Sequence, residues 1–331
     1  MTEVALSGTE QVGTGDLGRE KALRWFRIGE SVFRGATFTA AVLVLILLCG
    51  VILSLIVGSV PAFRAFGLGF FTSQSWNPVT EKFGALAPIY GTVVTSIIAM
   101  VIGVPVGIGI AIFLTELCPY SLRRPIGVAI ELLAGIPSII YGIWGLFVFA
   151  PFLQATLQPG LINTFANIPV LNSLFAGPPY GIGVLTAGLI LAVMVLPFIT
   201  AITRDVFLTV PLVLKEAAYG VGCTTWEVVR KVVLPYTRVG VIGGVMLGLG
   251  RALGETMAVT FVIGNAHRVS ASILAPGTTI SAAIANEFTE AVGDVYTSSL
   301  IALGLVLFII TFIVLAAARL MLMRIERSLG T

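Results

Sequence analysis

The sequence predicts an all-α membrane protein that crosses the bilayer about six times. Two features of its composition predict this fold class: 57% of its 331 residues are hydrophobic, and only 11% are charged. Soluble domains carry about 25% charged residues, because their surface faces water. The third observation is that the apolar residues fall in runs of about 20 or more, which is the length needed to cross a bilayer. The net charge of +3 is too small to indicate a nucleic-acid partner, and none is expected.

The predicted membrane domain covers residues 35–325. It follows a tail of residues 1–34, which we expect to be cytoplasmic and partly disordered. Residues 1–18 are rich in Gly, Thr and Glu, and they lack the apolar residues that a folded core requires. The six predicted spans are residues 36–60, 89–115, 126–152, 181–203, 239–264 and 298–320.

The basic residues indicate how these spans are oriented. Fifteen of the 19 Lys and Arg residues lie in the two terminal segments and in the connections between spans two and three and spans four and five. Arg64, Lys82 and Arg268 lie in the other connections, and Arg251 lies inside span five. Because cytoplasmic connections carry an excess of Lys and Arg, both termini are predicted to be cytoplasmic. The outward connections, rich in Pro, Gly and aromatic residues, are residues 61–88, 153–180 and 265–297.

The cytoplasmic segment 204–238 is patterned as two short helices. Pro211 is suited to open the first one, since a first turn does not need the missing N–H. Two glycines then break the run, a threonine is placed to cap a second helix, and Pro235 ends that helix before span five. These glycines and threonines are Gly220, Gly222, Thr224 and Thr225. The two helices would expose Glu216 and Tyr219 at the membrane surface; the alternative is a solvated amphipathic loop.

Span five contains an arginine and a glutamate. A charge at the centre of a spanning helix costs about 2.5–3.5 kcal/mol on insertion scales. Arg251 is close to the middle of the predicted span, and Glu255 lies one turn further on, so the two side chains share a face and can pair. One interpretation is a structural ion pair that holds span five to its neighbours.

The other interpretation of this pair is a path for an anion, because ionisable residues inside a membrane usually mark a pathway or a site. Nearby glycines leave room for a small ligand, and a guanidinium presents a planar fork of donors to phosphate or carboxylate oxygens. The pattern therefore predicts an anion path at Arg251 and Glu255, and Thr256 is included as a candidate contact. The residues alone do not separate phosphate from sulfate.

The chain lacks the residues that enzymes and nucleotide-binding proteins require. Cys49, Cys118 and Cys223 are scattered, and His267 is the only histidine, so neither a catalytic set nor a metal site is expected. There is no GxxxxGK[ST] stretch, the glycine-rich loop that holds nucleotide phosphates. We therefore expect no cofactor on this chain, and ATP hydrolysis, if it drives the protein, takes place on a partner.

The 204–238 segment resembles the signature loop of ABC-importer permeases. That signature is EAA, three residues, Gly, nine residues, a β-branched aliphatic residue, one residue and Leu-Pro. Here its members are Glu216, Ala217, Ala218, Gly222, Val232, Leu234 and Pro235. Val232 stands where the family usually has Ile. The resemblance implies a type I (MetI-like) permease fold, with a cytoplasmic coupling helix, including Tyr219, that sits in a groove of a separate ATPase.

Longer stretches resemble the C-type permeases of bacterial high-affinity phosphate importers. Two of them are IELLAGIPSIIYGIWGLFVF, from Ile130, and LPYTRVGVIGGVMLGLGRALGETMAVTFVIGN, from Leu234. The resemblance implies a multi-pass protein of the bacterial inner membrane that pairs with a second, homologous permease. It also implies two copies of an ATPase that binds ATP-Mg, and an extracytoplasmic phosphate-binding protein. It places Arg251 and Glu255 along the phosphate path.

Three alternatives remain open at this stage. An ABC permease for another oxyanion, such as sulfate or molybdate, would use the same loop and the same arginine. An ion-coupled secondary carrier would carry an internal repeat or acidic residues in several spans, and the sequence shows neither. A membrane-embedded enzyme would need a cluster of nucleophile, base or metal ligands.

Overall fold

The computed structural model describes the backbone of residues 14–328, and the side chains of residues 29–168 and 171–324. The chain divides into two compact units, Met1–Val57 and Gly58–Thr331. Within the described residues, six helical segments are long and apolar enough to cross a membrane, as the fold class predicts. These segments are Gly29–Phe66, Leu86–Leu117, Ser138–Phe165, Val184–Leu208, Thr225–Gly254 and Asp294–Arg324.

Helix α1, Thr14–Phe66, accounts for the described part of the first unit and ends in the second. Residues 1–13 of the predicted tail lie outside the described residues. From Thr14 onwards the chain is helical, so α1 begins well before the predicted start of span one at residue 36. Its first turns carry Glu, Lys, Ala, Leu and Arg, which are strong helix formers, and no proline interrupts them.

The second unit is built around α9, Val184–Leu208, which is the most buried of the six spans. Helices α3, Leu86–Ile112, and α12, Leu234–Gly254, pack against it. A Cβ added at Gly107 of α3 or at Gly248 of α12 would lie 2.9 Å from the side chain of Ile199. Small residues therefore let both helices approach α9 closely, as is common between helices in membranes.

The third span lies further along the chain than predicted. Residues Tyr120–Ala134 form a separate helix, α4, and the apolar span covers Ser138–Phe165 instead of 126–152. The break falls at Gly135, Ile136 and Pro137, because a residue that precedes proline is disfavoured in the helical region. The span is a series of short helical segments: α5 Ser138–Trp144, η2 Gly145–Phe149, α6 Ala150–Phe152, η3 Leu153–Leu157 and α7 Gln158–Phe165.

The fifth span also differs from the prediction at both ends. The second loop helix does not end at Pro235: α11, Thr225–Val228, the π-helical turn η4, Val229–Val233, and α12 form one continuous segment. The N–H of Leu234 donates to the carbonyl of Val229, five residues back. This wider turn directly before Pro235 accommodates a residue that has no N–H and whose ring crowds the preceding turn.

Helix α12 then stops at Gly254, ten residues before the predicted end of span five, and a short helix α13, Met257–Val262, follows. The last span, α15, Asp294–Ser328, is longer than the predicted 298–320. The remaining elements are η1 Phe113–Leu117, α2 Gly69–Thr72, α8 Pro169–Leu174, α10 Leu212–Gly220 and α14 Ile280–Glu287.

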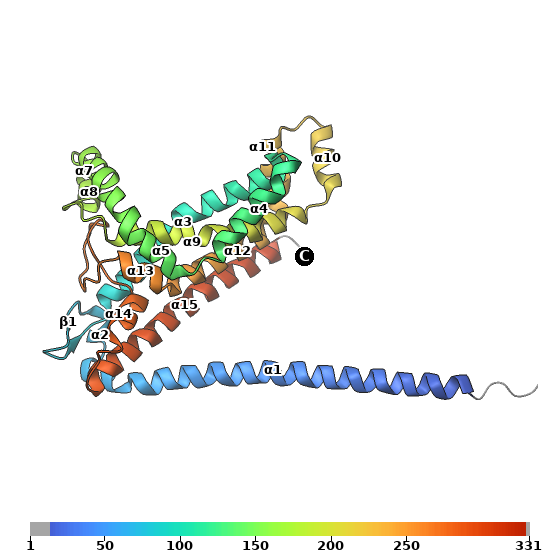
Figure 1. Cartoon of the computed structure of the whole chain (residues 1–331), viewed down its shortest axis with the longest axis horizontal. Helices are drawn as coiled ribbons and strands as arrows, with labels where there is room; N and C mark the ends of the chain where they lie inside the picture. The colour runs from blue at the N-terminus through green and yellow to red at the C-terminus, as the bar shows by residue number, and fades with distance from the viewer. Residues whose placement is uncertain (1–13, 329–331) are drawn as a thin grey trace, which may run out of the picture. The chain divides into compact units, whose positions relative to one another are not determined.

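Figure 1 shows α10 and α11 at one end of the second unit, and β1, α2, α7 and α8 at the other. We call these the α10 end and the β1 end. Strands β1, Trp76–Asn77, and β2, Lys82–Phe83, pair antiparallel, with Trp76 opposite Phe83. The described parts of the predicted outward segments lie at the β1 end, where they pack as short helices and turns (Figure 1).

A polar cluster sits among the aromatic rings of the β1 end. The carboxylate of Glu287 accepts a hydrogen bond from the hydroxyl of Tyr296 at 2.8 Å and another from the indole of Trp76, and it pairs with His267 Nε2 at 2.7 Å. The His267 ring stacks on Trp76, with centroids 5.0 Å apart. Burial alone would raise the pKa of Glu287, but these hydrogen bonds outweigh it and hold the pKa below its ordinary value.

Candidate translocation site and coupling surface

The fifth span breaks beside its two charged residues. Glu255 follows the last residue of α12 and has extended backbone angles, φ −68° and ψ 130°, and α13 begins at Met257. A break of this kind leaves backbone groups without helical partners, which membranes tolerate only where the backbone is buried in protein or lines a cavity. Discontinuous spans are typical of transporter binding sites. The sequence analysis did not predict the break, since no proline marks it and apolar residues resume at Met257.

Arg251 lies in the last turn of α12 and has no close ionic partner. Its Nη2 is 4.0 Å from Glu255 Oε2, well beyond the usual length of a charge-assisted hydrogen bond. Its guanidinium carbon lies 4.6 Å from the ring centroid of Phe198 on α9, within cation–π range. The buried Nε has no hydrogen-bond partner among the described residues. The predicted pair is therefore present as a loose contact, and most donors of the arginine remain available.

A pocket of about 550 Å³ lies beside Arg251. Gly243 and Gly250 line it, and a Cβ added at Gly243 would meet nothing within 4 Å. Leu247, also in the lining, is 55% exposed, so the pocket opens onto the surface of this chain. The glycines thus leave space next to the guanidinium, as predicted from the sequence.

Thr256 occupies the break itself. Its hydroxyl donates to the carbonyl of Gly254 at 3.3 Å, and its own carbonyl accepts from the hydroxyl of Thr260 at 2.8 Å. The first bond satisfies a carbonyl at the end of α12, and the second lies in the first turn of α13. Arg251, Glu255 and Thr256 therefore lie together at one place, and a substrate contact by Thr256 stays a prediction.

The predicted coupling residues gather at the α10 end. Pro211 precedes α10, and Glu216, Ala217, Ala218 and Tyr219 lie on that helix. Gly222 turns the chain with φ +88°, a region that favours glycine. Thr224 caps α11 in a full capping box with Glu227, which confirms one of the two predicted caps.

The members of this coupling segment divide between the bundle and the surface. Ala218, Val232 and Leu234 pack against a buried cluster that includes Ala111 and Phe207, the ends of α3 and α9. Glu216, Ala217 and Pro235 are exposed. The coupling segment also exposes four large apolar side chains, Leu212, Val213, Val221 and Trp226. Several large apolar side chains exposed on one short segment are typical of a protein-binding surface.

An ion pair that the sequence analysis missed ties α10 to the bundle. Lys215 Nζ lies 2.6 Å from Glu116 Oε1 in η1, and the two side chains are only 12% and 6% exposed. The partners are 99 residues apart in sequence, so no local pattern links them. Phe198, beneath Arg251, was missed for the same reason. The Lys215–Glu116 pair joins the coupling segment directly to the end of span two.

A helical membrane protein with a broken, charged span and an exposed two-helix surface at one end belongs to the class of transport permeases. Comparison with known proteins supports this class. Residues 103–327 match the family described as binding-protein-dependent transport system inner membrane component. The chain therefore belongs to that family, as the signature loop predicts.

Similar proteins narrow the comparison further. The chain is 71% identical over 312 residues to the phosphate transport system permease protein PstC of Mesorhizobium japonicum, covering 94% of this chain and 95% of that protein. It is 58% identical over 301 residues to the protein of the same name from Pasteurella multocida, covering 91% and 94%. Its fold is similar to the MetNI methionine ABC transporter in an inward-facing conformation, with a TM-score of 0.54, 18% identity and coverage of 72% and 94%.

Proposed function

We propose that this chain is the permease subunit of an ATP-driven, binding-protein-dependent importer of inorganic phosphate. The observation that carries the proposal is the position of Arg251: a guanidinium with free donors, at a break in an apolar span, beside an open pocket. The high identity to proteins named as phosphate permeases supports phosphate as the cargo.

The α10 end faces the cytoplasm in this proposal, with both termini on that side of a bacterial inner membrane. The charge distribution supports this orientation. Arg230 and Lys231 lie in η4, directly after α11, and Arg123 donates to the carbonyl of Thr115 in η1, next to the Glu116 that pairs with Lys215 of α10. The exposed face of α10 and α11 receives one of two copies of an ATPase, which binds ATP-Mg and performs the hydrolysis. The β1 end receives the phosphate-binding protein.

A second, homologous permease completes the path. The pocket beside Arg251 opens onto the surface of this chain, and a facing subunit would close it into a cavity. A charged residue inside a membrane is expected to face a bundle interior or an aqueous cavity and not lipid. Arg251 and Glu255 would then line that cavity between the two subunits.

The transport cycle follows from these contacts. ATP binding closes the ATPase pair and displaces α10, and the Lys215–Glu116 pair carries that displacement to span two. The bundle opens outward, the binding protein releases phosphate, and Arg251 attracts it. After hydrolysis the bundle opens inward, and Glu255 competes for Arg251 as the anion leaves. A loose pair suits this role, since a site on a path must bind weakly enough to release its cargo.

Another oxyanion, such as sulfate or molybdate, would find the same donors at Arg251, so the experiment must separate these cargoes. The complete complex, with both permeases, the ATPase and the binding protein, is placed in proteoliposomes that contain ATP. We expect uptake of labelled phosphate that requires ATP and is unchanged by excess sulfate or molybdate. Uptake of sulfate in place of phosphate would contradict the assigned cargo, and uptake without ATP would contradict the ABC-importer mechanism.

A further inference from the structure

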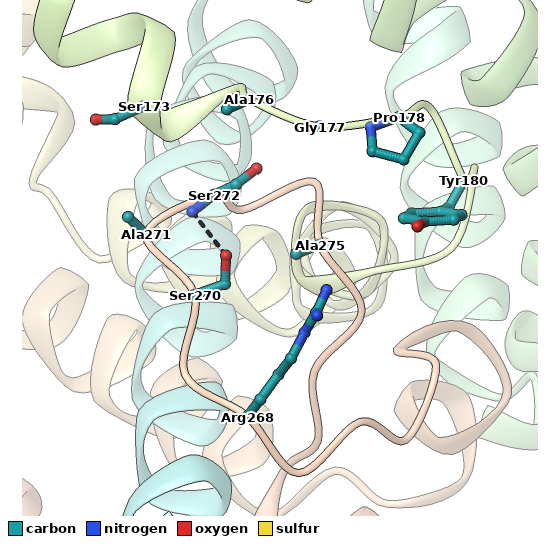
Figure 2. A pocket seen from close by; sticks show the side chains of 10 residues that line it. All are labelled: Ser173, Ala176, Gly177, Pro178, Tyr180, Arg268, Ser270, Ala271, Ser272 and Ala275. Carbon is teal, nitrogen blue, oxygen red and sulfur yellow. Dashed lines mark hydrogen bonds between the residues drawn. The ribbon is translucent and has the colours of Figure 1, made fainter.

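A second pocket, at the β1 end, has the chemistry of an anion site. It measures about 330 Å³ and lies between two segments, one around residues 173–180 and the other around residues 268–275. Figure 2 shows the Arg268 side chain reaching into the space between these segments, toward Ala275. No Asp or Glu lines the pocket.

The frame of this pocket is fixed by hydrogen bonds from outside it. The N–H of Ile273 donates to the carbonyl of Leu174 at 2.9 Å and joins the two segments. The carbonyl of Ser270 accepts from the hydroxyl of Tyr90 on α3 at 2.8 Å, and the carbonyl of Ile273 accepts from Leu185 N–H on α9 at 2.8 Å. The backbone of the loop is therefore anchored to two spanning helices, which fixes the positions from which its side chains project.

Three side-chain donors in this pocket have no acceptor among the described residues. The Arg268 guanidinium makes no hydrogen bond or ion pair among the described residues, although it is always charged. Ser270 Oγ accepts from the N–H of Ser272, and Ser272 Oγ accepts from the N–H of Leu274, each at 3.2 Å. Both hydroxyl oxygens thus act as acceptors, and their protons have no acceptor among the described residues. A guanidinium and two free hydroxyl protons match the oxygens of a small oxyanion.

The sequence connects this pocket with Arg251. Span five breaks at Glu255, α13 adds a rise of about 9 Å, and the chain then enters the loop that carries Arg268. Gly264 turns the chain here with φ +89°, and Gly277 holds the start of the loop: its carbonyl accepts from the N–H of Ala266 at 2.9 Å and its N–H donates to the carbonyl of Ile263 at 3.0 Å. Arg251 therefore precedes α13 in the sequence and Arg268 follows it, so one short segment of chain carries both arginines.

We infer that the Arg268 pocket is an entry subsite for the transported oxyanion, which receives phosphate at the β1 end before it reaches Arg251. The inference rests on the proposed function, since it takes the cargo and the orientation from it. The exposed position of Arg268 fits this role, because a water-screened guanidinium binds weakly and releases its anion readily.

The first test measures anion binding directly. Inorganic phosphate is titrated onto the purified complex without binding protein and followed by the line width of its ³¹P NMR signal. An Arg251→Gln background removes the deeper site. The ATPases and the second permease also offer sites for phosphate, so each variant is compared with the Arg251→Gln background. We expect Arg268→Gln to reduce the line broadening of that background, Arg268→Lys to reduce it less, and Lys82→Gln, another exposed basic residue at the β1 end, to leave it unchanged. Broadening in Arg268→Gln that equals that of the background would overturn the inference.

The second test uses uptake in proteoliposomes as a function of binding-protein concentration, with Arg251 intact. We expect Arg268→Gln to lower the maximal rate about tenfold and to leave the half-saturating concentration of binding protein unchanged. A raised half-saturating concentration with an unchanged maximal rate would overturn the inference, because the pocket would then dock the binding protein.

These tests separate the subsite from the proposed function. If the wild-type complex imports sulfate and not phosphate, the proposed cargo is wrong. Loss of the Arg268-dependent broadening of the phosphate signal when sulfate is added would still support the subsite for the anion that is transported. If the complex imports phosphate and Arg268→Gln changes neither the NMR signal nor the uptake, the subsite alone is wrong.

Discussion

Two of the acidic–basic pairs in the second unit differ in kind: one ties the coupling segment to span two, and the other lies at the break in span five. Lys215 and Glu116 are 2.6 Å apart and almost fully buried. Arg251 and Glu255 are 4.0 Å apart, and the arginine side chain is 35% exposed beside a pocket. The first pair holds two protein segments together, whereas the second leaves the donors of Arg251 available to a ligand.

The difference shows how one chain separates transmission from passage. A segment that must pull on a span needs a short, desolvated link, and removal of one partner of such a pair is costly because a buried charge is left behind. A site that an anion must enter and leave needs the opposite, a charge that no neighbour satisfies fully. The comparison predicts that changes at the two pairs will fail in different ways.

The largest effect is expected at Arg251. Arg251→Gln removes the charge that attracts the anion, and uptake of labelled phosphate in cells should fall about 100-fold, as for the loss of a charge-assisted interaction. Arg319→Gln, an exposed arginine near the end of α15, is the matched control and should transport normally. Copurification of the ATPase checks assembly. Loss of assembly in the Arg251 variant would show that the arginine is structural.

The next effect is expected at Lys215. Lys215→Met leaves Glu116 buried without a partner, which should cost about 3–5 kcal/mol of stability and lower the thermal unfolding temperature of the purified complex. Lys231→Met removes an exposed pair with Glu227 on the same segment and should lower the unfolding temperature far less, because water screens an exposed pair. The double variant Lys215→Met/Glu116→Leu should recover much of the loss. Equal effects of Lys215→Met and Lys231→Met would refute a special role for the buried pair.

A substitution at Gly222 tests whether the turn after α10 positions that helix for the ATPase. Its φ of +88° disfavours any side chain, although a Cβ there would meet no atom within 4 Å. Gly222→Val should therefore cost about 1–2 kcal/mol through backbone strain alone and weaken copurification of the ATPase, with Gly222→Asn milder. Gly220→Ala, two residues earlier and without a positive φ, serves as control. Full ATPase binding by Gly222→Val would show that the turn does not position α10.

The smallest effect is expected at a third pair, His267 with Glu287, which is short but joins no proposed moving part. The pKa of folded Glu287 is held below its ordinary value, so its contribution to stability is present above about pH 4.5 and is lost as pH falls through the folded pKa. Glu287→Gln should lower the unfolding temperature by a few degrees at pH 7, and the difference from wild type should shrink below about pH 4.5. A difference that is constant with pH would contradict this account.

Sequence patterns sufficed for the parts of the fold that depend on local chemistry. Apolar run length predicted six spans, and proline, glycine and threonine positions predicted α10, its turn and the cap at Thr224. The same local rules misplaced two spans. Pro137, expected inside span three, marks its beginning, and Pro235, expected to end a helix, lies within one because η4 widens the turn before it.

The parts that could not be predicted depend on contacts distant in sequence. Nothing near Lys215 indicates Glu116, and nothing near Arg251 indicates Phe198. The break at Glu255 was not predicted because no proline lies beside it and apolar residues resume at Met257. Tertiary packing determines these contacts and the position of the helix break, and the hydrophobic periodicity of the sequence carries no information on them.

The most direct test of the account measures ATP hydrolysis and phosphate uptake together, in the same proteoliposomes, for Arg251→Gln and Lys215→Met. We predict that Arg251→Gln keeps hydrolysis stimulated by the binding protein but loses uptake, because only passage of the anion fails. Lys215→Met should lose stimulated hydrolysis and uptake in proportion, because transmission fails. If both variants show the same ratio of uptake to hydrolysis, the two pairs do not act at different steps, and the separation of transmission from passage is wrong.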